Sequence, residues 1–302
     1  MKRRAFLQTL AATACALPAF GQTKPLPIGF STLGCPKWAW EKILAVAAEH
    51  GYAAIELRGL MGQMDLTKRP EFAPDRIEHT KKDLQARQIK ISCLGASSRM
   101  HETDPAKRAA QMDEARRFID LAAQLAAPYV RVFGDKLIPN VSRDESIKQV
   151  AAGLRELGEY AAPKNVTVIL ESHGDYTDSP TLGAILQQAG GKGIALLWDA
   201  HHTFASGGEA PDVTIKQLGR YIRHTHLKDS KKTGSPDPAK AREYVLTGQG
   251  EVPVREQVRQ LMKLGYRGYY SFEWEKMWHP EIPDPEIAIP HFANVIHEYL
   301  NG

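Results

Sequence analysis

The chain has 302 residues, of which 43% are hydrophobic and 25% are charged, a composition typical of a globular protein with one large core. No apolar run reaches the roughly 18–20 residues needed to span a bilayer, so no transmembrane segment is predicted in the mature chain. The formal net charge of +4 falls to +1 without residues 1–21, which hold three basic residues and no acidic one. A near-neutral chain lacks the positive charge expected of a nucleic-acid-binding protein.

Residues 1–21 have the pattern of a secretory signal peptide. A basic head at 2–4 precedes the apolar stretch 5–17, and small residues follow where a signal peptidase cleaves. The run 3–8, Arg-Arg-Ala-Phe-Leu-Gln, resembles the twin-arginine export motif. An ordinary signal that contains two arginines is the alternative, and Cys15 has a poor context for a lipid anchor. The sequence therefore predicts an exported, periplasmic protein.

Residues 22–302 are predicted to form one domain, in which β-rich runs alternate with amphipathic helical segments. The predicted strands are 27–32, 53–58, 90–95, 129–134, 166–171, 194–199, 222–227 and 269–274. The clearest predicted helices are 40–48, 112–125 and 254–264, where apolar residues recur at i, i+3 and i+4.

Helix boundary signals support this alternation. Predicted helix starts lie at Asp104-Pro105, Ser142 and Ser179-Pro180, and predicted helix ends lie at Gly51 and Gly265. Eight β/α units of uniform composition predict an α/β protein with a closed (β/α)₈ TIM barrel. A doubly wound open sheet is the alternative, but it would normally show a glycine-rich phosphate loop after the first strand. The segment 30–36 is not such a loop.

Metal-binding types of side chain stand at the ends of the last four predicted strands. They are Glu171, Asp199, His226 and Glu273. The carboxyl ends of barrel strands meet at one mouth, where barrel enzymes have their active sites. Carboxylate oxygens with one imidazole suit one divalent ion, Mn²⁺, Mg²⁺ or Co²⁺, with Zn²⁺ as a further candidate.

The physical argument for this ion is charge repulsion. Three carboxylates crowded together raise one another's pKa unless a cation lies among them. One acidic residue at a strand end is more often a helix cap or an ion-pair partner than a ligand. A metal site is favoured here because a side chain of a metal-binding type stands at the end of each of the last four predicted strands.

Five motifs resemble the sugar phosphate isomerase/epimerase-like proteins of the xylose-isomerase-like barrel superfamily. They are Leu170-Glu171-Ser172-His173, Asp199-Ala200-His201-His202, His224-Thr225-His226-Leu227-Lys228-Asp229, Gly248-Gln249-Gly250-Glu251 and Ser271-Phe272-Glu273. The resemblance implies that the four strand-end residues are the metal ligands. It also implies that His202 lies beside the metal and contacts substrate, and that Lys228 and His173 contact substrate.

This constellation predicts proton chemistry next to a sugar carbonyl. A divalent ion polarises the carbonyl as a Lewis acid and stabilises the enediolate, while Glu171 and Glu273 take and return the proton. The outcome is epimerisation or isomerisation, or, through loss or gain of a β-oxygen, lyase or hydratase chemistry on 3-keto glycosides. Because phosphorylated sugars are mainly cytoplasmic, export favours an unphosphorylated sugar or keto-sugar.

Two other functions are alternatives to the sugar isomerase or epimerase. An apurinic-type endonuclease shares the barrel, but it needs a trinuclear zinc cluster and an Asp-x-His pair after His226, where 229–231 is Asp-Ser-Lys. A sugar-binding barrel without turnover is the non-enzyme alternative. No nucleic-acid or membrane partner is expected for the mature chain, and the oligomeric state, a homo-oligomer included, is left open.

Other residues near the predicted mouth have weaker signals. Trp278 either stacks on a sugar or packs the barrel top, and Glu56 and His101 are expected to support the site rather than act in it. The polar segment 230–243 is predicted to be a surface loop over the mouth. Cys35 and Cys93 are placed on strands separated by a third, so no disulfide is expected between them.

Overall fold

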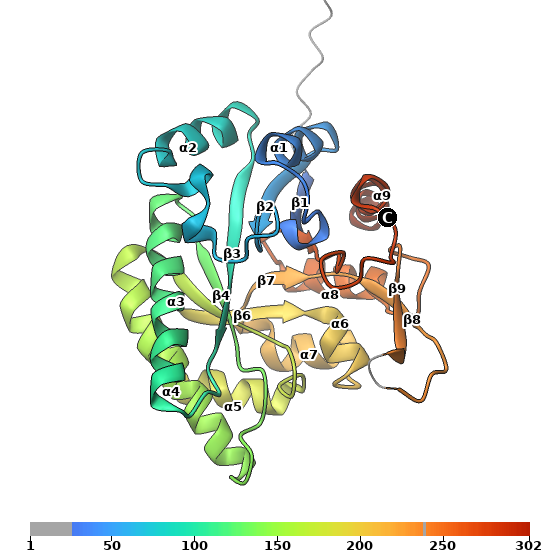
Figure 1. Ribbon diagram of the computed structural model, residues 1–302. Helices are drawn as coiled ribbons and strands as arrows, with labels where there is room; N and C mark the ends of the chain where they lie inside the picture. Colours follow the sequence, from blue (N-terminus) through green and yellow to red (C-terminus); the bar gives the residue numbers. More distant parts are fainter. Residues whose placement is uncertain (1–25, 238–239) are drawn as a thin grey trace, which may run out of the picture.

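The structure, a computed structural model, describes residues 26–237 and 240–302 (Figure 1). The predicted signal peptide, residues 1–21, lies outside the described residues. Among the described helices, none combines the length and the apolar character that crossing a membrane requires.

Eight parallel strands form the barrel. Their order is β10-β1-β2-β3-β4-β5-β6-β7. The ends of this order meet, because Leu227 pairs with Phe272 and its N–H donates to the carbonyl of Ser271 at 2.8 Å. This closure confirms the predicted (β/α)₈ barrel. The strands are β1 (Leu26–Ser31), β2 (Tyr52–Leu57), β3 (Lys90–Arg99), β4 (Tyr129–Phe133), β5 (Thr167–Glu171), β6 (Ile194–Asp199), β7 (Ile222–His226) and β10 (Tyr270–Phe272).

Helices surround the barrel (Figure 1). They are α1 (Trp40–Glu49), α2 (Ile77–Ala86), α3 (Pro105–Gln124), α4 (Arg143–Ala161), α5 (Ser179–Ala189), α6 (Ala200–Ala205), α7 (Pro211–Leu218), α8 (Val254–Leu264) and α9 (Pro285–Asn301). The predicted boundary signals hold: Asp104 caps α3, Ser142 and Glu145 form a capping box at α4, and Gly265 ends α8 with φ of 73°. The cap of α5 is Asp178, one residue before the predicted start.

The segment 230–243 differs from its prediction as a loop. It includes most of an antiparallel hairpin of β8 (Asp229–Lys232) and β9 (Arg242–Val245). The buried carboxylate of Asp229 anchors the base of this hairpin, because it accepts hydrogen bonds from the backbone N–H groups of Ser230, Gly248, Gly250 and Val252. A side chain at Gly250 would collide with this carboxylate, since its Cβ would lie 2.2 Å from Asp229 Oδ1. The glycine-containing motif at 248–251 is therefore part of the hairpin anchor.

The placement of Cys35 on a strand was wrong. Cys35 follows a short 3₁₀ helix, Thr32–Gly34, because the chain turns at the end of β1. Cys93 lies on β3, and both cysteines are buried free thiols, as expected.

Alternation along the strands determines which side chains face the barrel interior. Ile169 and Leu197 belong to a small apolar cluster with Cys93 and Ala195, separate from the main core between strands and helices. Because successive side chains on a strand point to opposite faces, a residue two positions further on faces the same way. Glu171 and Asp199 therefore face the barrel interior at its mouth, above this apolar floor.

Candidate active site

The four predicted metal ligands converge at the mouth. One oxygen or nitrogen atom of each lies within 4.8 Å of the others. Nδ1 of His226 lies 3.1 Å from Glu273 Oε1, 3.6 Å from Glu171 Oε1 and 3.8 Å from Asp199 Oδ2. All four side chains are buried. The structure thus brings together residues that are up to about a hundred positions apart in the chain.

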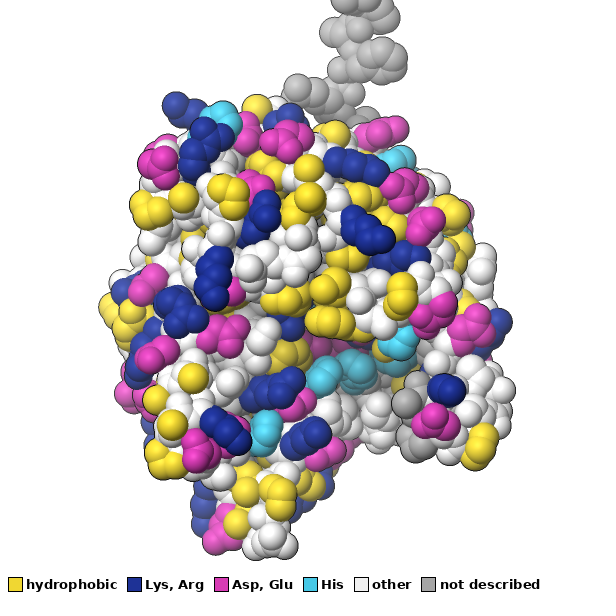
Figure 2. Space-filling view, viewed as in Figure 1, with side chains coloured by type: hydrophobic (Ala, Val, Ile, Leu, Met, Phe, Trp, Pro, Cys, Tyr) yellow, Lys and Arg dark blue, Asp and Glu magenta, His cyan; other side chains and the backbone are white. Residues whose placement is uncertain are grey.

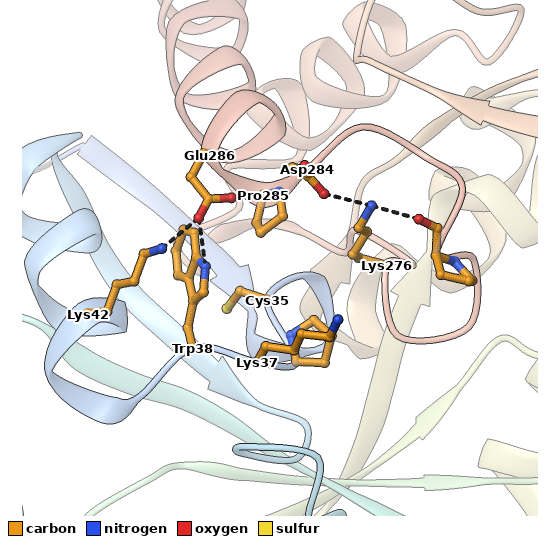
Figure 3. Close-up of a pocket in the computed structure, with 10 residues that line it drawn as sticks. Cys35, Lys37, Trp38, Lys42, Lys276, Asp284, Pro285 and Glu286 are labelled. Atoms are coloured by element: carbon orange, nitrogen blue, oxygen red, sulfur yellow. Dashed lines mark hydrogen bonds and ion pairs between the residues drawn. The ribbon is translucent and has the colours of Figure 1, made fainter.

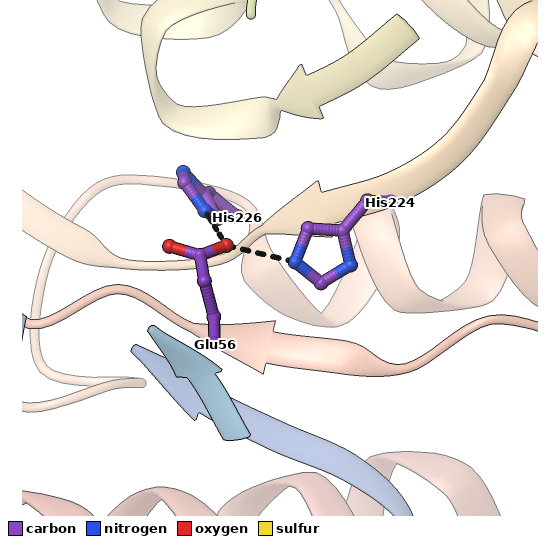
Figure 4. A group of neighbouring side chains, drawn as sticks. All are labelled: Glu56, His224 and His226. Atoms are coloured by element: carbon purple, nitrogen blue, oxygen red, sulfur yellow. Dashed lines mark hydrogen bonds and ion pairs between the residues drawn. The ribbon is translucent and has the colours of Figure 1, made fainter. Parts of the chain in front are cut away.

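The ring of His226 is held from its far side. Its Nε2 bonds Oε2 of Glu56 at 2.8 Å, and Nε2 of His224 bonds the same oxygen at 2.9 Å (Figure 4). Among the described residues, the buried Nδ1 of His226 has no hydrogen-bond partner. A ring fixed through one nitrogen, with the other nitrogen directed at three carboxylates, is the arrangement of a histidine that binds a metal. The donor set and the direction of this nitrogen fit a divalent ion.

Cationic side chains of the protein also reach these carboxylates. Arg131 Nε lies 3.1 Å from Glu171 Oε2. Lys228 Nζ lies 2.7 Å from Asp199 Oδ2 and 2.9 Å from Glu275 Oε1, and it also contacts Glu273. The prediction that a bound cation is needed to balance these carboxylates is therefore wrong in part, because Arg131 and Lys228 neutralise some of the negative charge. The converging ligand atoms, with Nδ1 of His226 directed at the three carboxylates, support a metal instead.

These ion pairs keep the ligand carboxylates ionised. Burial raises the pKa of Glu171, but Arg131 and His226 together outweigh it and the net pKa is lowered. Burial likewise opposes ionisation of Asp199 and Glu273, yet Lys228 and His226 lower the pKa of both. Carboxylates that are ionised at neutral pH can bind a cation and accept a proton.

The pKa values of two other groups at this centre are raised. Burial would lower the pKa of His226, but the charges of Glu273 and Glu56 raise it well above its ordinary value. The pKa of Glu275 is raised mainly by burial. Without a bound cation, a proton on His226 supplies part of the balancing charge.

Histidines line the open side of this centre. Figure 2 shows histidine side chains gathered in a hollow on this face, with acidic side chains beside them. The rings of His173 and His202 pack edge to face at 5.1 Å, and His202 Nε2 lies 3.6 Å from Asp199 Oδ2. Burial lowers the pKa of His202 to about 4, so its neutral ring can both donate to and accept from a sugar hydroxyl. Asp135 Oδ1 lies 3.6 Å from His173 Nδ1.

The other predicted substrate contacts differ in position. Lys228 is fully buried among the carboxylates, so the structure places it in the ligand cluster rather than on the open rim. Trp278 is 52% exposed and follows β10, where its backbone N–H donates to the carbonyl of Glu275. The Nδ1 of His101 bonds the carbonyl of Gly134 at 3.0 Å, in keeping with the supporting position expected for it.

Sequence reasoning missed two arginines and a tyrosine. Arg131 lies within β4, and the side chain of Arg58 follows β2 and bonds Ser97 Oγ at 3.1 Å. Gly95 makes room for both, because a Cβ there would lie 2.7 Å from Arg58 Cδ and 2.8 Å from Arg131 Nη2. The sequence signal for Arg131 was its charge inside the apolar run of β4.

Tyr244 on β9 packs against the rings of His201 and His279, with centroids 5.4 and 5.0 Å away. The hairpin therefore forms one wall of the mouth. Nothing in the sequence near Tyr244 indicated this position, because it depends on how the hairpin folds back over the barrel.

A separate cavity of about 530 Å³ lies between the start of α1 and the start of α9 (Figure 3). Lys42 there is paired with Glu286 at 2.6 Å, and Lys276 with Asp284 at 2.9 Å. Burial raises the pKa of the Cys35 thiol in this cavity, so the thiol is unreactive at neutral pH. The cavity holds none of the candidate ligands.

Known proteins share this fold and this arrangement of strands. Residues 44–293 match the family described as xylose isomerase-like TIM barrel. The chain belongs to that family. It is 28% identical over 268 residues to a fructoselysine 3-epimerase of Shigella flexneri, covering 83% of this chain and 90% of that one.

Other family members have different reactions. The chain is 32% identical over 162 residues to an inosose dehydratase of Klebsiella pneumoniae subsp. pneumoniae, spanning about half of each protein, 49% and 51%. Solved structures of the same fold include L-ribulose 3-epimerase, with a TM-score of 0.72 at 17% identity over 91% of this chain and 94% of that one. The IOLI protein with a bound zinc atom has a TM-score of 0.72 at 18% identity, covering 90% and 96%.

The relatives confirm the prediction at the level of reaction class. They are epimerases and a dehydratase, so the chain is an enzyme of the isomerase and epimerase type within a family that also includes lyases.

Proposed function

We propose that the protein is a divalent-metal-dependent isomerase or epimerase that acts on an unphosphorylated sugar or keto-sugar by moving a proton next to a carbonyl. One observation supports this most directly: Nδ1 of His226 and an oxygen of each of Glu171, Asp199 and Glu273 lie within 4.8 Å of one another. When bound there, Mn²⁺, Mg²⁺, Co²⁺ or Zn²⁺ would supply Lewis acidity toward a sugar carbonyl. The zinc in the related IOLI structure supports a metal in this family fold.

Glu171 and Glu273 are the proposed proton-transfer residues. They come from β5 and from the residue after β10, which are well separated around the barrel. Each carboxylate has one oxygen facing His226 and the other against a cation, Arg131 for Glu171 and Lys228 for Glu273. The cations hold each carboxylate in one orientation and keep it ionised, as a general base must be. Two bases at different positions around one substrate can remove a proton from one face and return it to the other.

His202 and His173 are the proposed substrate-binding residues of the rim. Both lie on the open side of the ligand cluster, and Asp135 orients His173. Trp278 is proposed to stack on the sugar ring, since its indole is exposed on the segment that follows Glu275. These groups would orient the sugar so that the carbon next to its carbonyl faces a carboxylate.

A lyase or hydratase is the second candidate, and the similarity to inosose dehydratases favours it. Removal of the same proton followed by loss of a β-oxygen gives dehydration, with a protonated group supplying the proton that leaves with the oxygen. Glu275, whose pKa is raised mainly by burial, is a nearby group able to hold such a proton. The candidate substrates are 3-keto glycosides.

Export is part of the proposal. The predicted twin-arginine signal at residues 1–21 supports a periplasmic location. That location favours a sugar without phosphate. The expected distribution is activity in the periplasmic fraction, and replacement of Arg3 and Arg4 by Lys should retain the precursor in the cytoplasm.

The test compares chelated and metal-loaded protein with ketoses and 3-keto glycosides in D₂O. We expect chelation to abolish turnover, one divalent ion to restore it, and deuterium to appear on the carbon next to the carbonyl. Glu209→Gln is a matched control, because Glu209 is a structural carboxylate that accepts hydrogen bonds from Ser179 and Thr214, outside the site. Folded, chelated protein with full activity would refute the metal-dependent mechanism. Sugar binding without deuterium uptake would favour a binding protein.

A further inference from the structure

Glu56 binds two histidines with a single oxygen atom. Its Oε2 lies 2.8 Å from Nε2 of His226 and 2.9 Å from Nε2 of His224. Glu56 lies near the carboxyl end of β2, whereas both histidines lie on β7, on another part of the barrel wall. Figure 4 shows the carboxylate between the two rings. This contact therefore joins two strands that are not neighbours in the sheet.

The contact determines which ring nitrogens carry protons. An ionised carboxylate only accepts hydrogen bonds, so each histidine must donate from its Nε2. When the ring of His226 is neutral, its Nδ1 then has no proton and presents a lone pair. That lone pair faces Glu273, Glu171 and Asp199 at 3.1–3.8 Å.

Water does not compete for this contact. Glu56, His224 and His226 are each at most 1% exposed, and Cys93 is paired with Glu56 across β2 and β3. Without Glu56, a neutral His226 could carry its proton on Nδ1, and that proton would exclude a metal ligand bond from the same atom.

We infer that Glu56 is a positioning residue that fixes the proton of His226 on Nε2 and so makes Nδ1 the metal-binding atom, with His224 holding the carboxylate in place. This inference rests on the proposed metal centre. Glu56 acts through His226 and does not itself bind metal or substrate. A purely structural role would instead affect only the stability of the β2–β7 contact.

Glu56→Gln distinguishes the two roles. The amide has nearly the same size, but its NH₂ group can donate to Nε2 and favour the wrong tautomer of His226. We expect the Kd for Zn²⁺ or Mn²⁺, measured by calorimetry on the purified mature protein, to rise by about 10- to 100-fold. Glu56→Asp keeps an acceptor and should lose less metal affinity than Glu56→Gln. His224→Phe removes the second donor to Glu56 and should also lose less metal affinity than Glu56→Gln. Glu209→Gln should bind metal as the wild type does.

A second measurement reads the ligand atom directly. In the ¹⁵N NMR spectrum of Zn²⁺-loaded wild type with ¹⁵N-labelled histidine, we expect Nδ1 of His226 to have the chemical shift of a metal-bound nitrogen. We expect Nε2 to carry a hydrogen-bonded proton. Coordination through Nε2 would overturn the inference. So would Zn²⁺ affinity within twofold of wild type in a folded Glu56→Gln variant. A wild type that binds no metal would refute the proposed function instead, which keeps the two failures distinguishable.

Discussion

The two halves of the barrel contribute differently to the site. Strands β5, β6 and β7, and the residue after β10, provide the candidate metal ligands. Strands β2 and β4 provide Glu56 and Arg131, which contact His226 and Glu171 from behind. One half therefore presents ligand atoms to the mouth, and the other half holds those atoms in orientation and charge. Changes in the first half should affect chemistry most, and changes in the second should affect stability and metal affinity.

The largest effect is expected from the proposed proton-transfer residues. Glu171→Gln and Glu273→Gln each replace a carboxylate that would both bind the metal and move a proton. We expect kcat to fall by about 10²–10⁴-fold, the usual range for loss of a general acid or base, and deuterium uptake to fall with it.

Their separate contributions can be resolved by metal titration. If a variant regains wild-type kcat at saturating metal, the residue is a ligand without a role in proton transfer. A kcat unchanged at all metal concentrations would remove that residue from the site.

The next largest effect is expected from the supporting half. Arg131→Met leaves the buried carboxylate of Glu171 without its guanidinium, and both side chains are 1–2% exposed. Breaking a buried pair from one side typically costs about 3–5 kcal/mol, so the free energy of unfolding in urea should fall by about that amount for the metal-free protein.

Bound metal should recover part of this loss, because a dication replaces the missing positive charge near Glu171. Urea titrations with and without Zn²⁺ measure the difference. Equal losses in both states would show that Arg131 and the metal centre are independent, contrary to the division of roles between the two halves.

The sequence predicted the ligand half better than the supporting half. Glu171, Asp199 and Glu273 each directly follow an apolar strand, so a chemical type and a position indicated them together. Arg131 and His224 lie inside strands, where alternation gives their direction but not their partners. Their partners lie on other strands, and pairing across a barrel depends on its closure and stagger.

The hairpin shows a different limit. The polar, lysine-rich composition of 230–243 predicted a loop. The hairpin forms because the buried Asp229 carboxylate fixes its base through four backbone N–H groups. Such an anchor depends on tertiary burial of one side chain, which local composition does not report.

Metal binding by the ligand half should also depend on pH, with a smaller effect than the substitutions above. The pKa of His226 is raised in the metal-free protein, against the effect of burial, by Glu273 and Glu56, so the metal must displace a proton from this ring. The Kd for Zn²⁺ should fall by about tenfold per pH unit for one released proton, from about pH 6 up to the raised pKa.

The stability of the metal-free protein should change in the opposite direction. A histidine whose pKa is raised by folding stabilises fully below its unfolded pKa of about 6.5 and loses that contribution as pH rises through the raised value. Melting temperatures with and without Zn²⁺ should therefore diverge as pH increases. A pH-independent difference would show that His226 carries no proton in the metal-free state.

The smallest effect is expected at the rim, where Trp278 is 52% exposed and contributes to neither half. If its indole stacks on the sugar, Trp278→Ala should raise KM by about 3- to 10-fold, the equivalent of roughly 0.5–1.5 kcal/mol. The kcat and the melting temperature should stay at their wild-type values, because Trp278 is half exposed and is not one of the candidate ligands. Trp278→Phe, which keeps an aromatic face, is the matched control and should retain most of the affinity. An unchanged KM in Trp278→Ala would limit substrate recognition to the buried centre and its histidines, which would make the ligand half responsible for binding as well as for proton transfer.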